Sequence, residues 1–144
     1  MVSRRLLRNL LNHRWRRRAL DPELVREKMA AVDRDELLAL VSGMPHAVED
    51  YPFGEEVAVF KVGGKMFALV SLDGEPGVVN LKCDPALALQ LRQQYAAVRP
   101  GYHQNKRHWN SVDLDGSLDA EELREMVQHS YDLVVASLPR RSWP

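Results

Sequence analysis

The amino-acid sequence predicts an α+β fold, with helices packed on one face of an antiparallel β-sheet. Short segments with alternating apolar residues are joined by glycine turns, which is typical of β-hairpins. Segments with helical periodicity stand before, between and after these strands, without the regular strand–helix–strand alternation that builds parallel sheets. The predicted order is helix, three strands, helix, two strands, helix.

The first predicted helix covers residues 33–43. It begins with a capping box, in which Asp33 and Glu36 satisfy backbone amides of the first turn. Gly43 and Pro45 then end it, because neither residue continues a helix well. The loop that follows contains proline, glycine and four carboxylates, namely Glu49, Asp50, Glu55 and Glu56.

Three strands are predicted next. Residues 57–62 alternate and are rich in valine, and 65–72 form the returning strand. Gly63-Gly64 suits the two-residue turn between them, because both positions of such a turn need positive φ angles. A second turn at 73–77 leads to a third short strand at 78–82.

Asp84 predicts an N-cap, and Pro85 suits the first helical position. The apolar face of this second helix consists of Leu87, Leu91, Tyr95 and Val98, which places its end just before Pro100-Gly101. Residues 102–115 predict a hairpin around Asn105-Lys106-Arg107. Asp119 and Glu122 form another capping box, and a final long helix is predicted from there to Pro139.

The composition indicates a single domain over residues 31–139, followed by a tail at 140–144. Apolar residues make up 45% of the 144 residues, which is enough for a packed core. The single cysteine, Cys83, excludes an internal disulfide and fits a reducing compartment, so we expect a cytoplasmic monomer. No apolar stretch in the sequence is long enough for a membrane span.

The net charge of zero conceals an uneven distribution. Residues 1–28 carry nine positive and three negative side chains, whereas the rest carries eleven and seventeen. Residues 1–30 are therefore a basic, arginine-rich extension, either disordered or a short amphipathic helix. As a helix it could lie on an anionic membrane or along nucleic-acid phosphates. A transit-type segment and a solvated extension are the other interpretations.

The segment 100–110 is the strongest candidate for a functional site. It combines two histidines, two cations, two asparagines and two aromatic residues, which an ordinary hairpin does not require. Aromatic rings can stack on bases, and lysine and arginine neutralise phosphates. The candidate nucleic-acid-binding residues are Lys82, Tyr102, His103, Asn105, Lys106, Arg107, His108, Trp109 and Asn110. With Lys82, Arg92 and Arg99, the window 82–109 is locally basic.

Other interpretations of these residues stay open. Tyr102 and Trp109 could be a cross-strand packing pair, and the two histidines could be structural. Cys83, His103 and His108 lack the spacing of zinc ligands, so we expect no metal there. The acidic loop 49–56 could hold a cation or a partner protein, although such loops are more often simply solvated.

Catalysis finds little support in the sequence. The glycine turns lack the lysine and hydroxyl residue of a phosphate-binding loop. The serines lack the context of a nucleophile elbow. A buried, inert Cys83 is favoured over a reactive one. We therefore expect neither an enzyme nor a bound cofactor.

Several motifs together resemble the MmcQ/YjbR family. They are Tyr51-Pro52-Phe53-Gly54, the segment 59–68, the segment 81–85, the run 100–110 and the segment 129–134. The resemblance covers residues 33–138 and implies a frataxin-like (CyaY-like) fold, also called double-wing. It also implies a non-enzymatic DNA-binding protein, without catalytic residues to transfer. The alternative is a frataxin-like cation-binding or protein-interaction module that uses the acidic loop and does not bind DNA. The arginine-rich extension departs from the family pattern.

Overall fold

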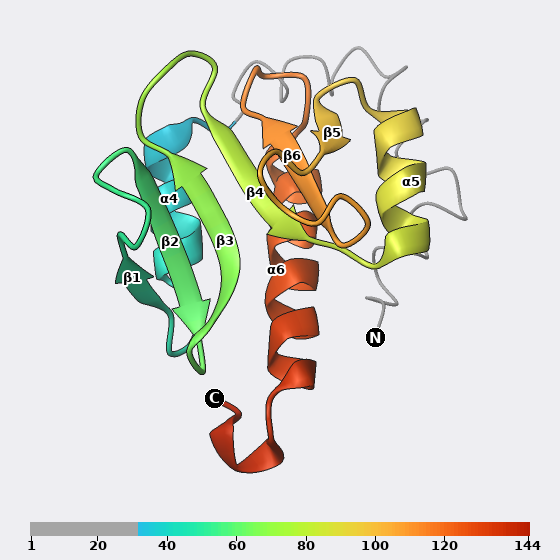
Figure 1. Cartoon of the computed structure of the whole chain (residues 1–144). Coiled ribbons are helices and arrows are strands. Elements are labelled where there is room, and N and C mark those ends of the chain that lie inside the picture. The colour runs from blue at the N-terminus through green and yellow to red at the C-terminus, as the bar shows by residue number, and fades with distance from the viewer. Residues whose placement is uncertain (1–31) are drawn as a thin grey trace.

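The computed structural model describes residues 32–144, so the predicted basic extension at 1–30 lies outside the described residues. The described chain forms a six-stranded sheet in the order β1-β2-β3-β4-β6-β5. Every pair of neighbouring strands is antiparallel. Figure 1 shows helices α4 and α6 behind this sheet and α5 beside its β5 edge. The predicted α+β class is confirmed.

The elements follow one another along the chain. They are α4 (Arg34–Ser42), β1 (Val48–Asp50), β2 (Val57–Val62), β3 (Lys65–Ser71), β4 (Val78–Lys82), α5 (Pro85–Gln94), β5 (Val98–Pro100), β6 (Trp109–Asp113), α6 (Ala120–Ser137) and the 3-10 turn η1 (Arg140–Ser142). Within residues 32–144, no helix has the length and apolarity needed to cross a bilayer.

The predicted helix starts are confirmed by their caps. The carboxylate of Asp33 accepts a hydrogen bond from the Glu36 amide at 2.9 Å, and that of Asp119 accepts one from the Glu122 amide at 2.8 Å. Asp84 caps α5 in the same way, with Pro85 in the first turn. Each cap satisfies an amide that the helix itself leaves without a partner.

Three boundaries differ from the prediction. The hairpin expected over residues 102–115 starts earlier, because its first strand is β5 and residues 101–108 are loop. Residues 48–50, expected to be loop, form the short edge strand β1 along β2. The predicted end of the second helix lies just before Pro100, but α5 ends at Gln94 because Tyr95 has an extended backbone. The reason is tertiary, since Val98 pairs with Val112 and extends the sheet instead of the helix. The apolar side chain of Val98 therefore serves a strand.

The main core lies between the helices and one face of the sheet. Alternate strand residues point into it, such as Phe60 of β2, Val70 of β3 and Leu81 of β4. The helices contribute residues such as Leu37 and Leu87 to the same cluster. The intervening strand residues, which point the other way, occupy a face that these helices do not cover.

A smaller apolar cluster closes part of this second face, which we call the open face. Trp109 of β6 packs there with Val59 and Leu69, and Val57 and Met66 flank them. The three central residues come from three different strands, so the tryptophan spans the sheet and shields its middle from water. The rest of the open face remains available.

Ser130 of α6 fastens the helix to the sheet. The β3–β4 ladder ends at the pair Ala68 and Leu81. One step further, the Ser130 hydroxyl donates to the Phe67 carbonyl at 2.6 Å and accepts from the Lys82 amide at 2.8 Å. The fully buried hydroxyl therefore satisfies backbone groups of both strands.

The residues on either side of Ser130 make further buried hydrogen bonds. The Nε2 atom of His129 accepts from the Asp84 amide at 3.2 Å, and the Tyr131 hydroxyl donates to the Pro45 carbonyl at 2.7 Å. Burial lowers the pKa of His129 to about 4, and the nearby Asp84 carboxylate only partly opposes this effect. The imidazole is therefore neutral at pH 7, as its role as an acceptor requires.

We predict that Ser130→Ala lowers the free energy of unfolding by about 1–3 kcal/mol, because two buried backbone groups lose their partner. Urea denaturation measures this loss. The control is Ser137→Ala at an exposed position of the same helix, where the hydroxyl donates to the Val134 carbonyl and accepts from Lys65 Nζ. We expect less than about 0.5 kcal/mol for the control. Equal losses for both variants would contradict the role of Ser130.

We predict that His129 makes the protein less stable as the pH falls from 6.5 towards 4. Its pKa in the folded state is about 4, whereas the ordinary value is 6.5, so the unfolded chain binds the proton more readily in this window. The loss at the acidic end is on the order of 3 kcal/mol.

His129→Gln keeps an acceptor for the Asp84 amide but does not titrate. Denaturation of both proteins at several pH values isolates the histidine, because all the carboxylates are shared. The wild type should lose more stability than the variant below pH 6.5. Parallel pH profiles would show that His129 is not the responsible group.

Candidate nucleic-acid interface

The loop 101–108 joins β5 to β6 and contains most of the predicted site residues. Figure 1 shows it in front of the sheet, over the lower parts of β4 and β6. At its base the Gly101 amide donates to the Trp109 carbonyl at 2.9 Å. A Cβ at Gly101 would lie 2.7 Å from that of Trp109, so only glycine allows this close approach.

Arg92 of α5 fixes the far side of this loop. Its Nε donates to the Asn110 side-chain oxygen at 2.7 Å, and its terminal nitrogen donates to the carbonyls of Lys106 and Trp109. One planar guanidinium thus joins the helix, the loop and the start of β6. The Lys106 side chain itself stays exposed.

The loop presents an aromatic pair to solvent. Tyr102 is 64% exposed, and its ring lies 3.9 Å from the His103 ring, centroid to centroid, at a tilt of 51°. The Tyr102 carbonyl accepts from the side-chain nitrogen Nδ2 of Asn80, and the Tyr102 backbone amide donates to the Ser111 hydroxyl. The backbone of Tyr102 is therefore held by the sheet, while its ring is free to contact a ligand.

Beyond this pair the loop exposes Asn105, Lys106 and Arg107. The Asn105 side-chain oxygen accepts from the Arg107 backbone amide at 2.9 Å, which stabilises a local turn at these residues. His108 is half-buried, and its carbonyl accepts from the Cys83 amide at 2.7 Å.

Two predicted contact residues are buried instead. Trp109 is 9% exposed and belongs to the cluster on the open face, while Asn110 is 3% exposed and accepts the hydrogen bond from Arg92. Strand alternation explains this, because Trp109 points to the small cluster and Asn110 points to the helix side. Both side chains act in packing, so we do not include them in the surface proposed to contact nucleic acid.

The cations of the window 82–109 do not all remain available. Arg99 forms a two-point ion pair with Asp113, at 2.7 and 3.0 Å, and Arg92 is bound to the loop. Lys82, Lys106 and Arg107 form no ion pair within residues 32–144. Lys82 ends β4, and its register partner is Trp109, so it lies on the open face.

Cys83 is a structural residue. It is buried, and the loss of solvation raises the pKa of its thiol to about 12, with the charge of Asp84 acting in the same direction. In the described part of the chain, no three residues among histidine, cysteine, aspartate and glutamate gather as a metal site would require. A thiol with this pKa is a poor nucleophile at pH 7.

The acidic loop 49–56 is only partly free. Asp50 accepts a hydrogen bond from Lys61 Nζ at 2.9 Å, and this bond lowers the pKa of the Asp50 carboxyl. The other three carboxylates, Glu49, Glu55 and Glu56, are exposed.

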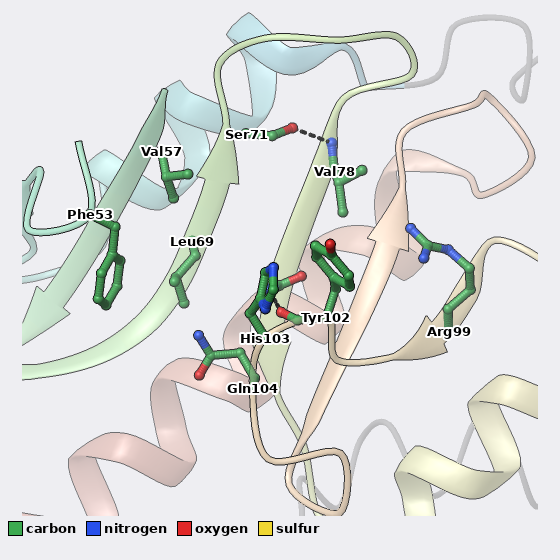
Figure 2. Close-up of a pocket in the computed structure, with 10 residues that line it drawn as sticks. Phe53, Val57, Leu69, Ser71, Val78, Arg99, Tyr102, His103 and Gln104 are labelled. Atoms are coloured by element: carbon green, nitrogen blue, oxygen red, sulfur yellow. Dashed lines mark hydrogen bonds between the residues drawn. The ribbon is translucent and has the colours of Figure 1, made fainter. Parts of the chain in front are cut away.

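A pocket of about 600 Å³ lies on the open face between the loops 51–56 and 101–108. Phe53 lines one side and the loop residues Tyr102, His103 and Gln104 line the other (Figure 2). The sequence reasoning missed Phe53 and Gln104 as site residues, and also Asn80 on the floor. One signal existed, because Asn80 is a polar residue between the apolar residues Val79 and Leu81 of β4, at a position that alternation assigns to the open face.

We predict that Arg92→Lys loosens the loop, because an ammonium group cannot span the three acceptors. The free energy of unfolding should fall by about 1–2 kcal/mol. Hydrogen exchange at the His108 amide, which donates to the Asn105 carbonyl, should accelerate about tenfold or more. Arg124→Lys, at an exposed position of α6, is the control. Unchanged exchange at His108 would contradict the role of Arg92.

Comparisons with known proteins agree with this architecture. The chain is 38% identical over 104 residues to the Escherichia coli K12 protein YjbR, covering 72% of this chain and 88% of that protein. It is 46% identical over 92 residues to YbdF of Escherichia coli O157:H7, covering 63% of this chain and 75% of that protein. Both relatives are described as uncharacterised.

The solved structure of a Deinococcus radiodurans protein with a DUF419 domain matches with a TM-score of 0.72 and 38% identity, covering 76% of this chain and 84% of that one. A crystal structure from Pseudomonas syringae matches with a TM-score of 0.63 and 27% identity, covering 72% and 99%. The YjbR family model matches residues 42–133, which is more than half of the chain. The chain therefore belongs to the YjbR family, as its sequence motifs predicted.

Proposed function

We propose that this chain is a non-enzymatic DNA-binding protein that contacts its ligand through the loop 101–108 and the adjacent open face. One observation carries the proposal: an exposed aromatic pair, Tyr102 and His103, stands in the same loop as Lys106 and Arg107, two cations that form no ion pair within residues 32–144. Stacking surface combined with positive charge is the usual recognition chemistry for single-stranded nucleic acid.

The phosphate contacts are assigned to Lys82, Lys106 and Arg107. These cations have no carboxylate partner within residues 32–144, so binding a phosphate does not require breaking an existing ion pair. Arg99 differs, because Asp113 neutralises it. A phosphate should therefore bind more favourably to the cations of the loop than to Arg99 of β5.

The remaining loop side chains supply hydrogen bonds. The exposed Asn105 and His103 present an amide nitrogen and an imidazole to solvent, and the half-buried His108 stands at the end of the loop. Such groups can bond phosphate oxygens or base edges. The arginines of residues 1–28 add phosphate contacts without sequence preference, as expected for a basic extension. The protein would act as a monomer in the cytoplasm.

A cation-binding or protein-interaction function of the acidic loop has less support. Asp50 is engaged by Lys61, and residues 32–144 contain no cluster of metal-ligating side chains. Calorimetry with divalent metals, including ferrous iron, tests this alternative directly. A heat of metal binding in the wild type that is lost when Glu49, Glu55 and Glu56 are replaced by glutamine would favour this alternative.

We predict that Lys106→Gln with Arg107→Gln lowers the salt dependence of DNA affinity. Each lost phosphate contact reduces the slope of log K against log salt by about 0.7 for a single strand, so the double variant should lose about 1.4. Fluorescence anisotropy at several salt concentrations measures the slope.

The matched control is Arg140→Gln with Arg141→Gln. It removes the same charge from the exposed turn η1, beyond the C-terminal end of α6. The control should keep the slope of the wild type. If both double variants change the slope equally, the charge acts only through the overall field of the protein, and the loop assignment fails.

A further inference from the structure

The pocket on the open face has the construction of a ligand site. Its volume of about 600 Å³ falls in the range of small-molecule sites. Its floor is the sheet itself, formed by Val57 of β2, Leu69 of β3 and Val78 of β4, together with the polar residues Ser71 and Asn80. Strand backbones hold this floor, so the pocket exists before a ligand arrives.

The walls of the pocket are aromatic. Phe53 is 61% exposed although it is large and apolar, and it stands on one side. On the other side stands the His103 ring, with the Tyr102 ring behind it, as Figure 2 shows. Two separate loops thus place rings beside one apolar floor. A flat ring between them would cover apolar surface of Phe53 that is now in water.

Three of the polar side chains that line the pocket, Ser71, Asn80 and Gln104, carry no charge. The Ser71 hydroxyl accepts from the Val78 amide at 2.8 Å, and Asn80 is held by Ser111 and by the Tyr102 carbonyl. Gln104 adds a side-chain amide at the edge. Among the described residues that line the pocket, Arg99 alone carries a fixed charge, and it is already paired with Asp113. The lining therefore favours an uncharged ring with hydrogen-bonding edges.

Positive charge lies just outside this neutral lining. Lys82 follows Asn80 by two residues on β4, so it lies on the same face about 6.6 Å further along the strand. Lys106 and Arg107 belong to the loop that forms one wall. A ligand with a neutral ring and a negative group attached to it matches both regions.

We propose that this pocket receives an unstacked nucleobase of a single-stranded nucleic acid, with Phe53 on one side of the base, the His103 ring of the aromatic pair on the other, and Lys82 near its phosphate. This inference rests on the proposed function and adds the strand state of the ligand. A base within a duplex is already stacked and paired, so it cannot enter. Binding therefore selects single strands at this site.

The experiment compares two probes with equal charge. One is a short single-stranded DNA oligonucleotide, and the other is a chain with the same number of phosphates but no bases. The full-length wild type should bind the first about tenfold more tightly, since one stacked base contributes about 5- to 150-fold. Phe53→Ala should lose most of this preference, and its salt dependence should stay unchanged.

Trp143→Ala is the matched control, because it removes another exposed aromatic ring, near the C-terminus. It should keep the preference for bases. Phe53 is exposed, so its replacement leaves the cores intact, and circular dichroism checks the fold of both variants. A Phe53→Ala protein that still prefers bases would overturn the pocket assignment.

A nucleoside titration separates the two proposals. Thymidine and adenosine carry no phosphate, and NMR follows the Gln104 side-chain amide in the wild type and in Phe53→Ala. Shifts in the wild type alone, without any binding of the oligonucleotide, would retain the base pocket and remove the DNA-binding function. Equal, salt-dependent binding of both charged probes, without nucleoside shifts, would retain DNA binding and remove the pocket. No binding of any probe would overturn both.

Discussion

A six-stranded sheet has two faces to protect from water, and the helices of this chain cover one of them. The other face depends on a single large side chain. Trp109 reaches over β4 to Val59 and Leu69, and the loop 101–108 folds over the same region. Because this covering is local, the part of the sheet near Val78 stays uncovered, and the pocket forms there. The geometry of the candidate site thus follows from covering a wide sheet with helices on one side only.

The loop must be rigid for such a pocket to have a defined shape, and its rigidity comes from polar contacts. Arg92 bonds to backbone and side-chain oxygens from three positions of the segment 106–110, and Asn80 holds the Tyr102 carbonyl. Because of these bonds, the side chains of Arg92 and Asn80 serve the structure of the loop and are less available to a ligand. As a result, the loop presents a fixed aromatic pair, while the cations that remain available are those without a structural task. Pre-organisation of this kind lowers the entropy cost of binding.

Local sequence signals predicted most of the helices and strands. An N-cap such as Asp33, or a turn such as Gly63-Gly64, depends only on residues a few positions away in the sequence. The end of α5 could not be predicted in this way, because Val98 has helical spacing but pairs with a strand that comes later in the sequence. The same limit applies to the site. Trp109 and Arg92 are residue types that often contact nucleic acid. Only the folded structure shows that Trp109 is buried on the open face and that Arg92 is hydrogen-bonded to the loop. Phe53 and Tyr102 are far apart in sequence, so no local pattern could reveal that they share a pocket.

The distribution of charge separates the groups that would bind phosphate from those that would select the strand state. The chain beyond residue 28 carries an excess of carboxylates, so most of its surface disfavours a polyanion. Phosphate contacts from the basic extension and the loop can overcome this repulsion, but they do not distinguish one strand state from another. In the proposed complex, the pocket beside those cations would make the distinction, because stacking between Phe53 and His103 needs a base that has left its helix. Affinity and selectivity would then reside in different residues. A change of salt concentration would alter affinity while leaving the preference for unpaired bases intact.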